Sequence, residues 1–154
     1  MTSTANPAPP TDTPHGASLR LLLFAVGGTV YGCDIGTVRE IVPIRQATRL
    51  PGTPAYVLGL INLRGAIVTV IDLAARLAGA AVVGHGSVVL AEYGNKQVGI
   101  AVDEVRDVEI LSPDRFEPAS GDVARGGIVS GLGHLDGGVV IVLDVPSVVR
   151  QVMA

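Results

Sequence analysis

Cysteine and aromatic residues are scarce in this chain of 154 residues, which has one Cys, no Trp, three Tyr and two Phe. The single thiol, Cys33, cannot form an internal disulfide, so a disulfide-stapled secreted scaffold is excluded and a reducing compartment is favoured. A lone cysteine in an apolar strand is typical of a core position. Hydrophobic residues make up 48% of the chain and are mostly Val, Leu, Ile and Ala, a composition typical of β structure.

Concentrated positive charge is also missing. The net charge is −3, and the eleven basic residues are spread from Arg20 to Arg150 without a cluster. Because a surface that follows nucleic-acid phosphates needs clustered Lys and Arg, nucleic acid is not an expected partner. Asp72 and Arg76 interrupt the most apolar region, which leaves no uncharged span of the roughly 18 residues that a membrane helix needs. We therefore expect a soluble chain without direct membrane insertion.

No catalytic constellation is present. His15, His85 and His134 lie far apart and far from Cys33, which argues against a metal site. Glycine-rich pieces such as "GIVSGLG" lack the Lys-Ser/Thr of a phosphate-binding loop, and Ser130 has no identifiable base partner. The sequence therefore predicts neither an enzyme nor a bound cofactor.

The first 17 residues contain four prolines and lack the basic start and apolar centre of a secretion signal. We expect a disordered leader over residues 1–17. The remaining residues, 18–154, are enough for one domain, or two intimate lobes, with a sizeable core.

An internal repeat is the most informative pattern. "YGCDIGTVREIVPI" (31–44) aligns with "VGIAVDEVRDVEIL" (98–111) at a shift of 67 residues, and "LGLINLRGAIVTVIDL" (58–73) aligns with "SGLGHLDGGVVIVLDV" (130–145) at a shift of 72. Two copies of this length are too few and too long for a solenoid. We expect two similar β lobes.

Each copy predicts the same series of elements. The expected strands and helices, with their equivalents in the second copy, are 20–26 (87–92), 30–35 (97–102), a bent or bulged segment 38–44 (105–111), a closing hairpin with a last strand 66–71 (138–143), and a short helix 73–78 (146–153). Thr53 and Pro54 can begin a further short helix, whereas residues 112–127 are expected to form a loop. Five short strands per copy favour an all-β fold with short helices and closed or nearly closed barrels.

The two closing hairpins differ at their tips. Asp136-Gly137 predicts a two-residue turn, because both residues tolerate positive φ. In the first copy Arg64 stands in the place of Asp136, before Gly65, and breaks this rule unless the turn is type II with only Gly65 at positive φ. Arg64 is then either a solvated tip residue or a protein-interface residue, to which its donor fork is suited.

Two recurring carboxylates, Asp72 and Asp144, follow a strand and precede a helical stretch, so we expect them to cap helices. Glu40 and Asp107 also recur, each after an arginine, with either a structural role or a place at an exposed edge. Surplus aliphatic residues can be core or can face a cleft between the lobes, where an exposed apolar groove marks a binding site. These residues are Val38, Ile41, Leu60, Val102, Val105 and Leu132.

Four motifs in order carry a resemblance to a known family. They are "VREIV" (38–42), "RLPGTPAYVLGLINLRGAIVTVIDL" (49–73), "VGIAVDEVRDV" (98–108) and "GLGHLDGGVVIVLDV" (131–145). Together they resemble the CheW family of chemotaxis coupling proteins, from about Leu19 to Val149.

The resemblance implies two five-stranded SH3-like β-barrels and no enzymatic activity. Members of the family are adaptors: they join the cytoplasmic tips of methyl-accepting chemoreceptors to the regulatory domain of the CheA-type histidine kinase. The receptor helix lies along an apolar groove between the lobes, a helix-in-groove mode. The chain is then expected to be cytoplasmic and recruited to membrane receptor arrays.

The resemblance also implies partner-binding roles for particular residues. The family's partner positions match Val38, Glu40, Ile41, Gly59 and Arg64, whereas Val102 and Val105 are candidates for the groove wall and Leu132 follows from the duplication. The alternative that the residues leave open is a β-barrel whose inter-lobe groove holds a small apolar ligand.

Overall fold

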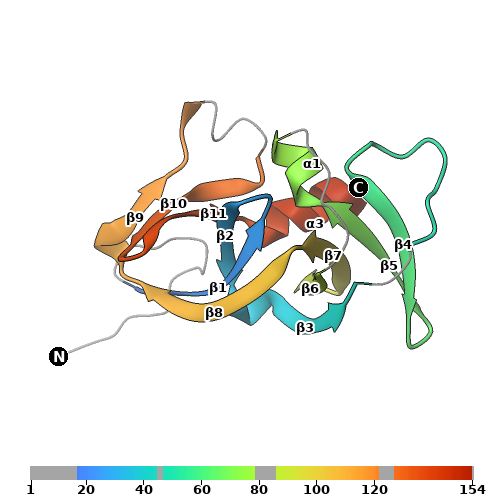
Figure 1. Ribbon diagram of the computed structural model, residues 1–154, viewed down its shortest axis with the longest axis horizontal. Helices are drawn as coiled ribbons and strands as arrows, with labels where there is room; N and C mark the ends of the chain where they lie inside the picture. The colour runs from blue at the N-terminus through green and yellow to red at the C-terminus, as the bar shows by residue number, and fades with distance from the viewer. Residues whose placement is uncertain (1–16, 45–46, 79–85, 122–126, 154) are drawn as a thin grey trace.

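The computed structural model describes residues 17–44, 47–78, 86–121 and 127–153, whose strands form two sheets that lie side by side (Figure 1). His15 and His85 lie outside these residues, as does the predicted leader except for its last residue, Ala17. The elements are β1 (Leu19–Val26), β2 (Thr29–Asp34), η1 (Ile35–Thr37), β3 (Val38–Pro43), β4 (Val57–Leu63), β5 (Ala66–Asp72), α1 (Leu73–Ala78), β6 (Ser87–Tyr93), β7 (Lys96–Val102), β8 (Glu104–Leu111), η2 (Pro113–Arg115), β9 (Phe116–Pro118), β10 (Val129–Leu135), β11 (Gly138–Leu143) and α3 (Val145–Met153).

Each sheet takes strands from both copies of the repeat. The sheet that we call the first lobe has the order β3-β6-β7-β5-β4, and the second lobe has the order β8-β1-β2-β11-β10-β9. The equivalent hairpins β1–β2 and β6–β7 are thus exchanged between the copies. Parallel pairs make the exchange: Thr69 of β5 is opposite Val98 of β7, and Ile141 of β11 is opposite Tyr31 of β2. The predicted lobes are present, but neither is one contiguous copy.

The exchange explains why β1 and β6 are apolar on both faces. Along β1, Leu21 and Leu23 point into the second lobe, whereas Leu22 and Phe24 belong to a core between the lobes. Successive side chains of a strand point to opposite faces, so a strand with a core on each side needs a continuous apolar run. The run "LLLFAV" in β1 meets this need, and "VVLA" in β6 does the same for the first lobe.

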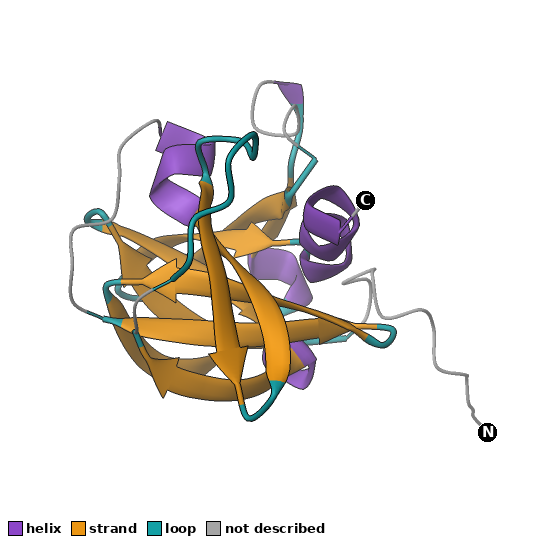
Figure 2. Cartoon of the chain, turned by 90° about the vertical axis from the view of Figure 1, so that its right-hand side faces the viewer, coloured by secondary structure: helices purple, strands orange, loops and turns teal. Residues whose placement is uncertain are grey.

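Three hydrophobic cores result, one inside each lobe and one between them. The central core is the largest and includes Phe24 and Ile100, which are fully buried, and residues from α1 and α3. Burying a side chain of this size contributes roughly 1.5–3 kcal/mol, so the central core fixes the lobes against one another. Figure 2 shows the strands of the nearer lobe curving around each other, with the helices outside the sheets.

Both predicted bulged segments are bulged. The pairing of β3 with β6 shifts register between Val38 and Glu40, and the pairing of β1 with β8 shifts between Leu22 and Phe24. A bulge bends its strand and increases the local twist, which a small closed barrel requires.

Each lobe is closed by a short segment that follows its bulged strand. In the first lobe Thr48 exchanges two backbone hydrogen bonds of 2.8 Å with Leu60 of β4. In the second lobe the equivalent contact is a full strand, β9, in which Glu117 lies opposite Leu132 of β10. The loop prediction for residues 112–127 is therefore wrong for Phe116–Pro118. Strand β9 is the reason that the second lobe has six strands instead of five.

The predicted helix caps are confirmed. Asp72 Oδ1 accepts from the Ala75 N–H at 3.1 Å at the start of α1, and Asp144 Oδ1 accepts from the Ser147 N–H at 3.2 Å at the start of α3. A helix beginning at Thr53 is absent from the described residues 47–78: Thr53 instead donates its hydroxyl to the Leu50 carbonyl at 2.8 Å, and the segment stays a turn.

Candidate functional site

The tip of the β4–β5 hairpin has an unusual backbone. Arg64 has φ 53° and Gly65 has φ 88°, and Arg64 is the one non-glycine residue with positive φ in the described ranges. Positive φ at both central residues is the pattern of a type I′ turn, so the type II alternative is wrong. The Asn62 side chain supports the turn, since its Oδ1 accepts from the Gly65 N–H at 2.9 Å.

The Arg64 side chain is paired with Glu40. The guanidinium donates from Nη1 to Oε1 of Glu40 at 3.0 Å and from Nη2 to Oε2, which makes a bidentate ion pair. The Glu40 carboxylate raises the pKa of Arg64 through this hydrogen bonding and its charge. Because β3 and β4 are the two edges of the first sheet, the pair spans the edges that close the barrel.

Two of the predicted partner residues form this pair, and two more lie on the same strand as Glu40. Val38, Glu40 and Ile41 lie on β3 and Arg64 lies at the hairpin tip, and we call these four residues the first-lobe surface. Ile41 is 43% exposed, whereas Val38 is half-buried and packs against the margin of the central core. The edge strand β3 thus carries an exposed aliphatic side chain and one partner of an ion pair, a combination that can serve in a protein interface.

Gly59 is not part of that surface. It is buried at φ 146°, and a Cβ there would lie 2.4 Å from the Thr48 carbonyl oxygen. Its equivalent Gly131 has the same environment, because a Cβ would lie 2.3 Å from the Glu117 carbonyl oxygen. The recurring glycine lets the closing segment cross β4 or β10 at close range, so its role is structural and the predicted partner contact is corrected.

Val102 is also corrected, because it is fully buried in the central core and offers no surface to a partner. Val105 is half-buried against the same core, and Leu132 is half-buried on β10 of the second lobe. The central core fills the space between the lobes that the sequence left open as a cleft. The predicted residues therefore do not line one groove.

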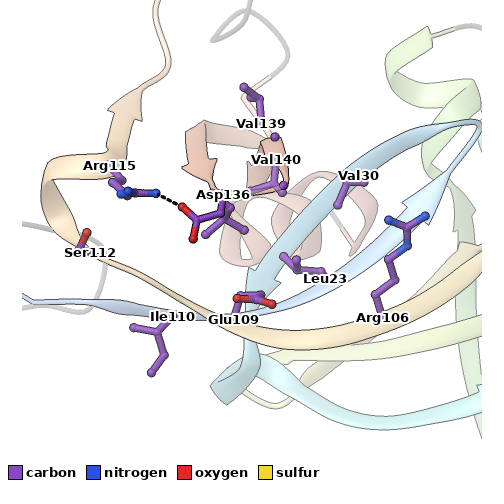
Figure 3. Close-up of a pocket in the computed structure, with 13 residues that line it drawn as sticks. Leu23, Val30, Arg106, Glu109, Ile110, Ser112, Arg115, Asp136, Val139 and Val140 are labelled. Atoms are coloured by element: carbon purple, nitrogen blue, oxygen red, sulfur yellow. Dashed lines mark hydrogen bonds and ion pairs between the residues drawn. The ribbon is translucent and has the colours of Figure 1, made fainter.

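A recess of about 510 Å³ lies instead on the second lobe (Figure 3). Its walls mix aliphatic residues with charged ones such as Arg106, Glu109 and Asp136, and Ile110 and Val139, which are 65% and 52% exposed, are among the lining residues. Arg115 reaches across it to Asp136, with Nη1 3.1 Å from Oδ1. We call Ile110, Val139 and the Arg115–Asp136 pair the second-lobe surface, and they repeat the combination of exposed aliphatic side chains and an ion pair.

Arg115 is not among the residues predicted from the sequence, although the duplication contains a signal for it. The places of Glu40 and Arg64 are taken in the second copy by Asp107 and Asp136, two like charges that cannot pair. The cation that pairs with Asp136 is Arg115 of η2. The Asp136 turn has the predicted two residues, since Leu135 is opposite Gly138, but positive φ is found at Gly138 and not at Asp136 or Gly137.

Catalytic chemistry finds little support in the described part of the chain. Residues 17–44, 47–78, 86–121 and 127–153 contain no group of three or more His, Cys, Asp or Glu that could hold a metal ion. Burial raises the pKa of the Cys33 thiol to about 12, which keeps it protonated and poorly nucleophilic. The Ser130 hydroxyl donates to the Val142 carbonyl at 3.2 Å, and His134 contacts Glu117 at 3.2 Å. Among the helices that the structure describes, none has the length and hydropathy to span a membrane.

Comparison with known proteins gives a consistent result. Residues 20–153 match the family model of the CheW-like domain. The chain is 40% identical over 100 residues to the chemotaxis protein CheW of Klebsiella aerogenes, which covers 64% of this chain and 60% of that protein. It is 38% identical over 110 residues to a probable CheW of Rhizobium etli, covering 68% and 71% of the two chains.

A more distant relative and a solved structure agree. CheW of Bacillus subtilis is 32% identical over 108 residues, or 69% of each chain. The crystal structure of the scaffolding protein TtCheW from Thermoanaerobacter tengcongensis superimposes with a TM-score of 0.72 at 29% identity, covering 82% of this chain and 88% of that one.

Proposed function

The chain belongs to the family of CheW-like domains, and on that premise we propose that it is a non-catalytic chemosensory adaptor that couples methyl-accepting receptors to a CheA-type histidine kinase. Its work is done through protein interfaces, and it is recruited from the cytoplasm to membrane receptor arrays. The domain that performs this work is the described β structure that begins near residue 18.

One observation carries the proposal: each lobe has exposed aliphatic side chains and an ion pair on its surface. The first-lobe surface has Ile41 on the same strand as Glu40 of the Arg64–Glu40 pair, and the second-lobe surface has Val139 in the recess that Arg115 and Asp136 also line. An adaptor must hold two partners at once, and two surfaces on separate sheets allow this without competition. Exposed aliphatic side chains beside an arginine can supply the apolar centre and the polar rim of a protein interface.

The alternative, a barrel that binds a small apolar ligand, is poorly supported by the packing. The barrel interiors are filled by their own side chains: Val88, Leu90 and Ala101 in the first lobe and Leu21 and Leu111 in the second are each at most 1% exposed. Small-ligand sites usually enclose most of the ligand, whereas the second-lobe recess lies at the surface with charged residues at its rim.

The proposed mechanism is thermodynamic linkage. The adaptor can change kinase activity only by as much as its contacts differ between the active and inactive arrangements of receptor and kinase. A packed central core between the lobes suits this task, because a displacement of one lobe is passed to the other rather than absorbed in a flexible joint.

Partner binding by single variants tests the proposal. The purified chain is titrated by calorimetry with a receptor cytoplasmic fragment and with the kinase regulatory domain from its own cell. We expect both to bind, Ile41→Asp to weaken one of them and Val139→Asp the other, each by about tenfold or more, because a carboxylate is then buried in an apolar contact. Leu50→Asp, a change at an exposed aliphatic residue in the loop before β4, is the matched control and should leave both affinities unchanged.

Two results contradict the proposal. If neither protein binds the wild-type chain, the adaptor function is wrong. If Ile41→Asp and Val139→Asp weaken the same single partner, the chain has one interface and does not join two proteins through separate lobes.

A further inference from the structure

A third surface feature lies away from both lobe surfaces, where α3 ends beside the β6–β7 turn. A hollow of about 570 Å³ is lined there by Tyr93, Lys96, Arg150, Met153 and the turn backbone at Gly94 and Asn95. The helix packs against β6 and β7, with Val148 and Val149 buried beneath it. The walls are therefore rigid elements, and the hollow exists before any partner arrives.

The charged side chains lining this hollow are both cations. Lys96 and Arg150 form no ion pair with the acids of the described residues, although the chain as a whole carries a net charge of −3. The Arg150 guanidinium lies 5.9 Å from the centroid of the Tyr93 ring, and its Nη2 donates to the Ser147 hydroxyl at 3.2 Å. These contacts orient the guanidinium and still leave donors for a carboxylate.

Apolar surface accompanies the two cations. Tyr93 is 48% exposed and Met153 is 37% exposed, and both line the same hollow. An aromatic face and a thioether beside two cations can accept an aliphatic side chain and carboxylates together.

The duplication shows that the fold does not require this composition. The equivalents of Tyr93 and Lys96 in the β1–β2 hairpin are Val26 and Thr29, and the equivalent of Arg150 in α1 is Ala78. The favourable interaction of a cation with a helix C-terminus accounts for Arg150 but not for Lys96, which is in the hairpin. The two cations and the exposed tyrosine are thus a feature of this one site.

We propose that the hollow between α3 and the β6–β7 turn binds an acidic peptide segment of a partner protein, with carboxylates on both sides of an aliphatic residue. Lys96 and Arg150 pair with the carboxylates, and the aliphatic side chain packs on Tyr93 and Met153. The contact is additional to the two lobe surfaces, so it persists in variants of Ile41 or Val139.

The test is an NMR titration of the full isotope-labelled chain with the capped peptide Glu-Glu-Leu-Glu-Glu. We expect shifts confined to amides of Tyr93–Gln97 and the end of α3, with binding about two- to fivefold weaker in Lys96→Glu and in Arg150→Gln, the range of an exposed ion pair. Raising the salt concentration weakens binding further, because the pairs are solvent-accessible. Arg20→Glu, a charge reversal at an exposed residue of β1, should bind like the wild type.

Three outcomes overturn the proposal. One is shifts that fall elsewhere on the chain. Another is equal affinity for the capped Gln-Gln-Leu-Gln-Gln peptide, which shows that carboxylates are not recognised. The third is that the chain binds tightly to vesicles containing phosphatidylglycerol, loses this binding in Lys96→Glu, and does not bind the acidic peptide. That result assigns the hollow to a membrane surface instead.

Discussion

Gly59 and Gly131 are equivalent residues that each lie against a backbone carbonyl of the segment closing their barrel. A Cβ would lie 2.4 Å from the carbonyl oxygen at Gly59 and 2.3 Å from it at Gly131. No side chain fits at either place without moving backbone. The pair shows that barrel closure in both lobes depends on the same close crossing.

Gly131→Ala is expected to lower the free energy of unfolding by about 1–3 kcal/mol, the usual cost of overpacking, because its Cβ also meets the Phe116 ring at 2.6 Å. Urea unfolding measures the change. Gly137→Ala is the matched control, six residues along, where a Cβ has no neighbour within 4 Å, and it should be close to neutral. Equal stability of the two variants would show that β9 moves aside easily.

Two variants of Arg64 separate the effect of its backbone conformation on stability from the effect of its side-chain contact. Arg64→Gly relieves the positive φ of 53°, whereas Arg64→Ala keeps it, and both remove the ion pair with Glu40. We expect the glycine variant to melt ~2–4 °C above the alanine variant, measured by differential scanning calorimetry.

Partner binding should follow the ion pair and not the melting temperature, so both Arg64 variants should bind less tightly than the wild type. If the glycine variant binds normally, the guanidinium has no interface role and Arg64 is a solvated tip residue.

Val38 and Ile41 both lie on β3 but differ in burial, so a charge introduced at each position should change the stability of the protein by a different amount. Val38→Asp should lower the free energy of unfolding by about 2 kcal/mol or more, since Val38 packs against the central core. Ile41→Asp should change it by no more than about 0.5 kcal/mol, because that side chain is 43% exposed. Thermal unfolding followed by circular dichroism distinguishes the two, and comparable losses of stability would place Ile41 in the core as well.

Because its thiol is buried, Cys33 should make the folded protein less stable at alkaline pH. Burial raises the pKa of its thiol to about 12, whereas an exposed thiol titrates near ~8.5. The folded state favours the neutral thiol, so this contribution is complete below the unfolded pKa and declines as the pH rises toward 12, by up to ~1.4 kcal/mol per pH unit.

Urea unfolding at about pH 8 and about pH 10.5 measures the decline, and Cys33→Ala is expected to lack it. Burial also raises the pKa of Tyr31, but that residue is present in both proteins and its effect cancels in the comparison. Parallel pH dependences of wild type and Cys33→Ala would mean that the thiol reaches solvent.

Local features of the fold were predictable because they depend on residues that are close together in the sequence. A strand needs only alternating or continuous apolar residues, and a cap needs one acceptor three residues before its donor. The strands and the caps at Asp72 and Asp144 were predicted on this basis, as were the bulges in β3 and β8. The repeat itself also predicted two similar lobes.

The contacts that make the candidate surfaces depend on residues far apart in the chain. Glu40 and Arg64 are 24 residues apart, and Arg115 and Asp136 are 21 apart, so no local interval states that they meet. The failure of the local turn rule at Arg64 did indicate a special position, but Glu40, with which its side chain pairs, is on another strand.

The sequence by itself determined that this protein is a duplicated aliphatic β structure with capped short helices, because periodicity, turn residues and caps act within a few residues. Only the tertiary structure decided which copy of each hairpin joins which sheet, since equivalent strands have equivalent apolar patterns and both pairings satisfy them. That exchange placed Val102 in the core between the lobes and left Ile41 and Val139 at the surface. Burial depends on what packs against a strand's second face, and a single strand's pattern does not contain that information.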